Sequence, residues 1–418
     1  MTTRISKILI ALPIIIFIAL IITGGTVCKN KAQAGNPYES IGLFTETMKK
    51  IQDLYWRDVD TKELIYGAIK GMVSSLDRYS SFMTPDQYKD MQADTKGSFG
   101  GIGIEITVKD GVLTVVSPIE DTPAFNAGIL AEDKILEING ESTQHMNVYD
   151  AVKKIRGPKG STVILTIIRE GFKSPKKFTL SRETIIVKSV KYKLLEPGYG
   201  YARITQFQER TDTDLKKVLD EMMGAGALKG LILDLRSNPG GLLDQALKVS
   251  DLFLSSGLIV YTDGRLENQK QRFEAKKGDD FSDGNMIVLV DGGSASASEI
   301  VAGALRDNQR AVLLGTKTFG KGTVQTIYPM QDGSAIRLTT AHYYTPGGES
   351  IEEKGIIPDI VVQLEKTTQA EVNGEQKSSY KEVDLKNDIQ LQRALDYLKS
   401  WNIFSTKSKN GNKVEARN

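Results

Sequence analysis

The feature that most restricts the fold is an alternation of apolar runs and amphipathic segments that starts near Arg182. LKGLILDL and NMIVLV are short apolar runs, and the second is typical of a strand that is buried on both faces of a sheet. DTDLKKVLDEMM and LLDQALKVSDLFL carry apolar residues at helical spacing, and they lie beside these runs in the chain. Strands that alternate with helices predict an α/β layered core for residues 183–365. Within it, the polar stretch DGRLENQKQRFEAKKGDDFSDG between two elements predicts a solvated loop.

The first 34 residues have the composition of an export signal. A basic start precedes an apolar stretch at 8–22, and Ala32–Ala34 fits an A-x-A cleavage site. We therefore expect 1–34 to be a signal peptide or an N-terminal anchor. An uncleaved anchor and lipidation at Cys28 are the alternatives to cleavage. All three place the body of the protein outside the cytoplasm, in the periplasm or on the outer face of the cytoplasmic membrane.

Composition argues against several classes of function. The chain has 418 residues, of which 40% are hydrophobic and 25% charged, as in ordinary soluble domains. The formal net charge is only +2 and no basic stripe is interleaved with aromatic residues, so we expect no nucleic-acid partner. Two histidines and one cysteine are too few for a zinc site of the Cys/His type. We expect neither a metal nor a cofactor.

Three further regions differ from the core in composition and in the spacing of their apolar residues. Residues 36–95 carry apolar residues at helical spacing and predict a helical arm, with Thr84 as N-cap and Pro85 opening its third helix. Residues 97–182 contain Val-, Ile- and Thr-rich runs between Gly and Asp turns, which predicts a β-rich domain. Residues 366–418 turn polar and predict one helix, capped by Asn387, and a disordered end from Ser405.

The stretch DGGSASASEIVAGAL takes a buried strand through a glycine turn into a helix. Such a turn exposes a side chain, and the helix N-terminus supplies unpaired N–H groups that can stabilise an oxyanion. One of its three serines is therefore a candidate nucleophile. The alternative is that all three only cap the helix.

A serine nucleophile needs a base. His145 lies in the β-rich region, and His342 on a core strand keeps a His-based triad open. Lys317 and Lys321 in GTKTFGKGTVQ are stronger candidates, because a lysine that is desolvated in an apolar, glycine-lined strand has a lowered pKa. Gln325 would share a face with Lys321 and could hold a neutral amine without charging it. The alternative is that these lysines are exposed surface charges.

Several long motifs, in this order, resemble the carboxyl-terminal processing proteases, which are tail-specific Ser/Lys peptidases. These motifs are LILDLRSNPGGLL, GGSASASEIVAGAL, GTKTFGKGTVQ and GSAIRLTTAHYYTPGGESIEEKGIIPDI. GGIGIEI, TPAFNAGILAEDKILEING and GPKGSTVILTIIR resemble a PDZ domain. The resemblance covers Tyr38–Val362. It implies a multi-domain α/β fold with a ClpP/crotonase-like ββα protease core, an inserted PDZ-like domain and an N-terminal helical arm.

The resemblance also implies roles for single residues. It makes Ser296 the nucleophile, Lys321 the general base and Gln325 the residue that supports the lysine. Oxyanion donors would be the backbone N–H groups of Ala297 and of either Gly240 or Gly241. The peptide-binding groove, which would capture an apolar carboxyl terminus by β-augmentation, falls on Gly101, Ile102, Gly103 and Ile104. Tyr79 stands where many relatives carry histidine; it lies in the expected helical arm and puts no catalytic residue in doubt.

Arg156 in KKIRGPKG is a candidate latch between the PDZ-like domain and the core, because an arginine can pair bidentately with a carboxylate. The alternative is a solvated arginine. The expected partners are polypeptides with free carboxyl termini and further copies of the chain, and an adaptor protein is left open. Other functions also stay open: a peptide-binding scaffold with a silent core, an acyl-handling enzyme that is no protease, or a Ser296–His342 mechanism.

Overall fold

The computed structural model describes residues 37–276, 281, 284–363, 385 and 387–415. The expected signal segment at 1–34 and most of the polar stretch between 364 and 386 lie outside the described residues. The chain forms two units, Met1–Gly71 and Met72–Asn418. Within the described residues, no helix combines the length and the apolar character that crossing a membrane requires.

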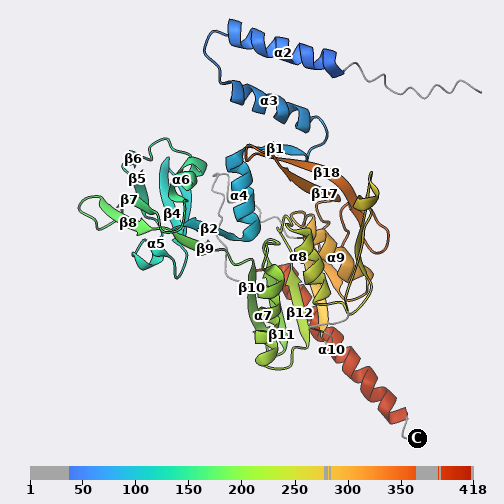
Figure 1. Cartoon of the computed structure of the whole chain (residues 1–418). Coiled ribbons are helices and arrows are strands. Elements are labelled where there is room, and N and C mark those ends of the chain that lie inside the picture. The colour runs from blue at the N-terminus through green and yellow to red at the C-terminus, as the bar shows by residue number, and fades with distance from the viewer. Residues whose placement is uncertain (1–36, 277–280, 282–283, 364–384, 386, 416–418) are drawn as a thin grey trace, which may run out of the picture. The chain divides into compact units, whose positions relative to one another are not determined.

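The first unit contains α2 (Pro37–Leu54) and most of α3 (Thr61–Ser74), drawn in blue in Figure 1. Both are helices, as the 3.6-residue spacing predicts. Large apolar side chains on and after these helices are exposed, among them Leu43, Leu54 and Trp56. Such exposure marks a surface that commonly packs against another protein surface.

The second unit begins within the stretch that the sequence assigns to the arm. β1 (Ser81–Met83) pairs antiparallel with β18 (Ala335–Tyr344), so this part of the arm contributes a strand to a core sheet. α4 (Pro85–Lys96) follows, and Thr84 caps it through a reciprocal pair of hydrogen bonds with Gln87. The predicted cap and the proline at the first helical position are both confirmed, because these signals act locally.

The β-rich domain contains one main sheet, two short helices and a two-stranded ribbon. The sheet follows the order β3 (Ile104–Lys109), β4 (Val112–Pro118), β5 (Lys134–Ile138), β7 (Thr162–Ile168) and β8 (Lys176–Ser181), and β6 (Glu141–Ser142) pairs with β5. The helices are α5 (Pro123–Asn126) and α6 (Val148–Ile155), and the ribbon is β2 (Ser98–Gly101) with β9 (Glu183–Ile186). β3 lies at the edge of the main sheet and contacts α6.

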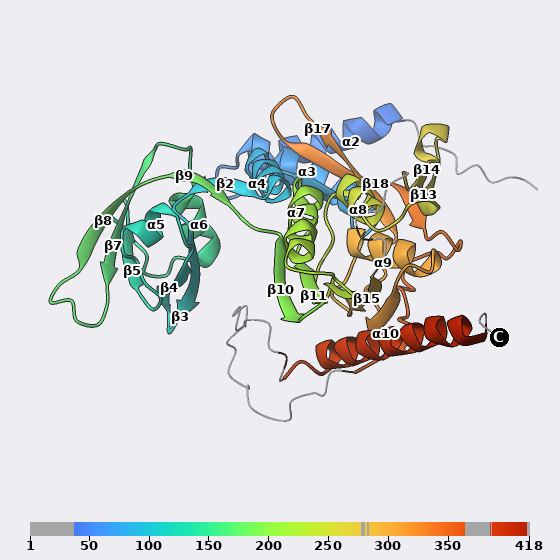
Figure 2. The ribbon, with the colours of Figure 1, turned by 90° about the horizontal axis from the view of Figure 1, so that it is seen from below.

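The core sheet has the order β10 (Val190–Glu196), β11 (Tyr199–Ile204), β12 (Gly230–Asp234), β15 (Asn285–Val290), β16 (Val312–Gly315) and β19 (Ile360–Val361). From β11 onward all neighbouring strands are parallel. Figure 2 shows helices on both faces: α7 (Thr211–Gly224), α8 (Leu243–Asp251) and α9 (Ala297–Asp307) on one, α10 (Ile389–Glu415) on the other.

Side chains of the parallel strands serve both layers. In β12, Leu231 and Leu233 pack in the cluster under α7–α9, whereas Ile232 packs with Leu398 of α10. This alternation explains why the run is apolar throughout, since neither face of the strand meets water. The predicted α/β layered core is thus what the chain forms.

Two predictions about the core were wrong. The polar stretch after Gly264 is more than a loop: it holds a short 3-10 helix, η1 (Glu267–Gln269), and β14 (Arg272–Glu274), which pairs with β13 (Leu258–Gly264). With one apolar residue, Phe273, between two charged ones, an edge strand this short shows no apolar pattern in the sequence. The last helix is capped by Asp388, whose carboxylate accepts the backbone N–H of Leu391, and α10 extends past Ser405.

Candidate active site

Three loops meet where parallel strands of the core sheet end. They follow β12, β15 and β16, and they carry NPGG, SASASE and TKTFGKG. In open sheets of parallel strands, sites form at this carboxyl edge because all the loops emerge on one side. Asp291 ties the first two loops together, since its Oδ1 accepts the backbone N–H groups of Ser237 at 2.8 Å and of Gly293 at 2.9 Å.

The three serines of SASASE have different partners. The Ser294 hydroxyl donates to the carbonyl of Leu235 at 2.8 Å, and the Ser298 hydroxyl donates to the carbonyl of Asn238 at 2.9 Å. Both outer serines are fully buried, and both fasten the start of α9 to the loop after β12. The interpretation that all three only cap the helix is therefore wrong for these two. Ser296, between them, is half-buried, and its hydroxyl contacts the hydroxyl of Tyr343 on β18.

The backbone of Ser296 adopts an unusual conformation. Its φ of 55° and ψ of −114° lie outside the regions that a non-glycine residue readily occupies. Strained conformations of this kind persist only where the surroundings enforce them, and they cluster at functional turns. The turn from β15 into α9 thus presents Ser296 in the manner of a nucleophile elbow.

A fully buried carboxylate joins the serine turn to the lysine loop. Glu299 Oε2 accepts the backbone N–H groups of Ser296 and of Lys321, each at 2.9 Å. Its Oε1 accepts the N–H of Gly320 at 2.7 Å and the Thr318 hydroxyl at 2.5 Å. Burial raises the pKa of Glu299, but all four neighbours are donors, so the ionised form is the one that satisfies the site. The backbones of Ser296 and Lys321 consequently lie two hydrogen-bond lengths apart.

Lys321 lies in a loop, not in the strand that the sequence predicts, because β16 ends at Gly315 and β17 (Thr323–Pro329) starts only at Thr323. Its side chain is partly buried, and its Nζ lies 5.2 Å from the centroid of the Tyr79 ring. Burial lowers the pKa of this lysine, the nearby Arg337 charge lowers it further, and Glu352 and Glu299 oppose the effect. Lys317, the other candidate, is exposed.

Gln325 lies on β17 with its amide group sheltered. Its Nε2 donates to the hydroxyls of Thr323 at 3.1 Å and Thr339 at 3.0 Å. Its Oε1 is buried, and among the described residues it has no hydrogen-bond partner. An unpaired buried acceptor is costly, so this oxygen is suited to receive a donor such as a lysine amine.

Within the described part of the chain, no hydrogen bond joins the Ser296 hydroxyl to the Lys321 amine. The serine hydroxyl instead contacts the hydroxyl of Tyr343, which is fully buried and also donates to the carbonyl of Lys321. Burial raises the pKa of Tyr343 well above its usual value, and the Ser296 contact opposes that effect. His342 precedes Tyr343 on the same strand and is exposed. Successive strand side chains face opposite sides, so His342 points away from Ser296 and a triad through it is ruled out.

The two glycines of NPGG differ in their hydrogen bonding. The Gly240 N–H donates to Asn238 Oδ1 at 2.9 Å and is therefore engaged. A Cβ atom on Gly240 would lie 2.8 Å from Ser296 Cβ and 2.9 Å from the nitrogen of Ala297, so the turn needs a glycine to pack against the start of α9. Of the two, Gly241 is the better candidate to offer a free N–H beside that of Ala297.

The predicted peptide groove lies at the start of the edge strand β3. Gly103 has a φ of 76°, and a Cβ there would lie 2.3 Å from the side chain of Thr122. Ile102 is fully buried in the core of the PDZ-like domain, so only its backbone remains for a bound peptide. Gly101 ends β2 and Ile104 begins β3, whose edge could accept an added strand.

Arg156 follows α6 and is partly buried. Its guanidinium stacks over the Phe99 ring at 4.1 Å, and its Nη1 lies 4.0 Å from Asp94 Oδ1 of α4. The pairing is with one oxygen at the limit of an ion pair, so it is not the bidentate pair that the sequence suggested. Burial raises the pKa of the Asp94 carboxyl, and the Arg156 charge opposes that effect.

Sequence reasoning missed three residues that the structure brings to the site: Glu299, Tyr343 and Tyr79. The pattern Ser-x-x-Glu indicates a local capping box, and it does not reveal that Glu299 also binds the lysine loop. Tyr79 was assigned only to the helical arm, and the structure places its ring beside the Lys321 amine. In the described residues, no cluster of three or more His, Cys, Asp or Glu side chains is arranged to hold a metal ion.

Comparison with known protein families gives three matches along the chain. The profile of Peptidase family S41 matches residues 198–362, and that of the PDZ domain matches residues 114–169. The profile of the activating protease CtpB N-terminal domain matches residues 24–87. These matches confirm the predicted multi-domain α/β protease fold with a PDZ domain and an N-terminal helical domain.

Individual relatives agree with these matches. The carboxy-terminal-processing protease of Bartonella bacilliformis is 43% identical over 405 residues, which cover 91% of this chain and 93% of the relative. The carboxy-terminal processing protease CtpA of Bacillus subtilis is 39% identical over 352 residues, 83% of this chain and 74% of the relative. Among solved structures, the photosystem II D1 C-terminal processing protease aligns at 28% identity with a TM-score of 0.46, over 77% of this chain and 92% of that one.

Proposed function

The chain belongs to the carboxyl-terminal processing proteases of peptidase family S41, and we propose that it is an exported endopeptidase that cuts polypeptides near apolar carboxyl termini. It is a serine peptidase with a PDZ domain, so its substrates are polypeptides. The single observation that carries the proposed mechanism is the shared Glu299 oxygen, which holds the backbones of Ser296 and Lys321 together.

In the proposed reaction, Lys321 acts as a neutral amine. Its burial lowers the pKa, which increases the neutral fraction near pH 7. The Nζ takes the proton of the Ser296 hydroxyl while the serine oxygen attacks the scissile carbonyl carbon. The protonated lysine then gives its proton to the leaving amine, which frees the new amino terminus and leaves an acyl-enzyme. In the second half, Lys321 takes a proton from a water molecule whose oxygen attacks the acyl carbon. The bond from that carbon to Ser296 Oγ then breaks, the lysine returns the proton to Oγ, and the new carboxyl terminus is released.

The oxyanion of each tetrahedral intermediate would accept hydrogen bonds from the N–H groups of Ala297 and Gly241. Ala297 is the first residue of α9, where the helix dipole adds positive potential. Gln325 would accept a hydrogen bond from the Lys321 amine through its unpaired Oε1. Before the first step the Ser296 hydroxyl must leave Tyr343 and turn to the lysine, so the described arrangement corresponds to a resting state.

Selection of the chain end is the proposed task of the PDZ domain. An apolar carboxyl terminus would add as a strand to the edge of β3, with its carboxylate at the turn of Gly101–Ile104. Arg156 would act as the latch that reports this binding, because it connects α6 to Asp94 of α4. The exposed apolar residues of the helical arm favour a homo-oligomer, and an adaptor could deliver substrate. The N-terminal segment would export the protein to the periplasm or to the outer face of the membrane.

The test compares the wild-type chain, expressed with its own N-terminal segment, with Ser296→Ala and Lys321→Ala. Lys317→Ala is the matched control, because this lysine lies in the same loop but is exposed. Each form receives an unfolded polypeptide with an apolar carboxyl terminus and its amidated twin, and mass spectrometry identifies the products. We expect cleavage by the wild type and the control only, and faster cleavage of the free carboxylate. Cleavage by Lys321→Ala at the wild-type rate would refute the dyad, and tail binding without any cleavage would favour a scaffold.

A further inference from the structure

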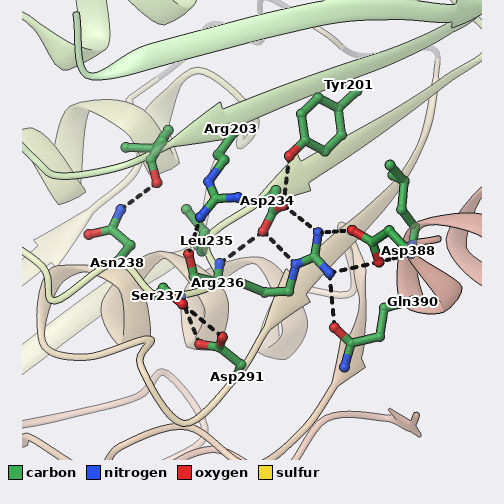
Figure 3. A network of polar contacts seen from close by, with 12 residues as sticks. Tyr201, Arg203, Asp234, Leu235, Arg236, Ser237, Asn238, Asp291, Asp388 and Gln390 are labelled. Atoms are coloured by element: carbon green, nitrogen blue, oxygen red, sulfur yellow. Dashed lines mark hydrogen bonds and ion pairs between the residues drawn. The ribbon is translucent and has the colours of Figure 1, made fainter. Parts of the chain in front are cut away.

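A buried network of charges links the C-terminal helix to the loop that carries NPGG. Figure 3 shows Arg236 between two carboxylates. Its Nε and Nη2 donate to the two oxygens of Asp234 at 3.0 and 2.7 Å. Its Nη1 and Nη2 donate to the two oxygens of Asp388 at 3.0 and 2.7 Å. The guanidinium is therefore held bidentately on both sides, which is the most restrictive geometry available to an arginine.

The charges of this network balance only when Asp388 is included. Asp234 is fully buried and also accepts the Tyr201 hydroxyl at 2.7 Å, while Arg203 lies 3.9 Å from it. Two arginines thus face two aspartates. Burial acts to raise the pKa of Asp388, but the Arg236 guanidinium holds it below the usual range, so the pair is charged at neutral pH. Without Asp388, one positive charge would be left uncompensated in a site where the Arg236 side chain is only 10% exposed.

Arg236 also begins the turn that reaches the nucleophile. Ser237 follows it with a φ of 54°, and the buried Asn238 then donates to the carbonyl of Ile204 and accepts the N–H of Gly240. After Pro239, Gly240 packs against the start of α9, and Gly241 packs against Phe207. The segment between Arg236 and these glycines is short, and its hydrogen bonds leave it little freedom to move. A shift of Arg236 must therefore displace the glycine turn relative to Ser296.

Asp388 also determines where α10 begins. Its Oδ1 accepts the backbone N–H of Leu391 at 3.0 Å, so the same carboxylate caps the helix and holds Arg236. α10 covers the face of the core sheet opposite α9, with Leu398 fully buried against the strands. One side chain, Asp388, therefore caps the C-terminal helix and binds the arginine that leads into the NPGG turn.

We propose that Asp388 is a positioning residue for the oxyanion turn at Gly240 and Gly241, so that its ion pair with Arg236 sets the turnover number. The inference rests on the proposed serine-peptidase mechanism for its effect on catalysis. The coupling between Asp388 and the turn can also be measured without catalysis, so failure of one can be distinguished from failure of the other.

The test uses Asp388→Ser in the full chain. Serine keeps a good N-cap for α10 but is too short to reach Arg236. Leu398→Ala is the matched control, because it weakens α10 through lost packing without touching the charge network. The readouts are hydrogen exchange of the peptide that spans 236–242, kcat and KM separately, and the melting temperature.

Asp388→Ser should speed exchange at 236–242 and lower kcat by about tenfold or more, with KM within about twofold of wild type, because the change affects the transition state and not substrate capture. Leu398→Ala should lower the melting temperature at least as much as Asp388→Ser does. At temperatures well below melting, it should leave kcat and hydrogen exchange at 236–242 unchanged. Equal loss of kcat in both variants, or unchanged exchange in Asp388→Ser, would overturn the proposal.

Two outcomes need a second variant or a second readout. If Asp388→Ser does not fold, Asp388→Asn keeps the cap and one acceptor oxygen, and it should give intermediate values of both readouts. If the wild type itself cuts no substrate, the proposed function fails, and exchange at 236–242 alone decides the coupling.

Discussion

Glu299→Gln tests whether the buried carboxylate holds the serine turn and the lysine loop together. The amide keeps the shape of the side chain but replaces one oxygen with an NH2 group. If its carbonyl stays on the N–H groups of Ser296 and Lys321, the NH2 group faces the N–H of Gly320 and the hydroxyl of Thr318. The Thr318 hydroxyl already accepts the N–H of Ile356 at 2.7 Å, but it can turn to accept the amide as well. The Gly320 N–H has no such option and stays unpaired.

The magnitude follows from these contacts. One buried N–H without an acceptor costs about 1–3 kcal/mol, and the remaining bonds lose the strength that a charged acceptor gives them. We therefore expect the free energy of unfolding to fall by about 3 kcal/mol, which is large for a change of so few atoms. Labelling of Ser296 by a fluorophosphonate should slow in parallel, because the lysine loop is no longer held to the serine turn.

Urea unfolding followed by circular dichroism measures the first effect, and the rate of labelling measures the second. Glu352→Gln is the control, because Glu352 accepts one backbone N–H, that of Gly322, and an exposed arginine, Arg78. It should cost about 1 kcal/mol or less. A loss of stability in Glu299→Gln no greater than in this control would refute the reasoning, since the four bonds would then contribute nothing beyond an ordinary surface contact.

Three further predictions concern the lysine and the latch. Arg337→Gln should move the acid limb of kcat/KM to higher pH and Glu352→Gln should move it to lower pH. Burial and Arg337 lower the pKa of Lys321, Glu352 raises it, and the neutral amine is the active form, so shifts of the same sign would contradict this. Gln325→Leu should slow single-turnover acylation about tenfold with KM retained, and an unchanged rate would exclude support of the amine. Arg156→Ala should abolish stimulation by an added carboxyl-terminal peptide, whereas unchanged stimulation and peptide affinity would remove the latch.

The sequence correctly predicts those parts of the fold that depend on residues close to one another in the chain. Thr84 and Pro85 mark the start of α4 because capping involves only neighbouring residues. β12 and β15 are recognisable because burial on both faces demands an unbroken apolar run. β14 escapes notice because it is short and carries a single apolar residue, Phe273, between two charged ones.

The candidate site divides in the same way. Ser296 is marked by the turn in which it lies, and Lys321 by a motif that resembles those of a known family. Glu299 and Tyr343 were not predicted because their partners come from distant segments: the carboxylate reaches the lysine loop, and the phenol reaches the serine turn. Contacts between segments that are distant in the chain leave no periodic pattern in the sequence. The placement of Lys321 in a loop follows from glycines at 320 and 322, which approach the backbone of Gly355 and Glu352 too closely for a side chain.

The shared Glu299 oxygen has a consequence for the life of the newly made chain. A protease that acquires activity while still partly unfolded would attack its own sister chains, whose carboxyl termini are then exposed. Here the backbones of the nucleophile and of its base are held by one carboxylate, Glu299, which accepts N–H groups from both loops, so we expect neither residue to reach its position before both loops have formed. We therefore expect the active site to form in the last step of folding. In a refolding experiment, reactivity of Ser296 should lag behind the return of secondary structure, and simultaneous recovery of the two signals would exclude this safeguard.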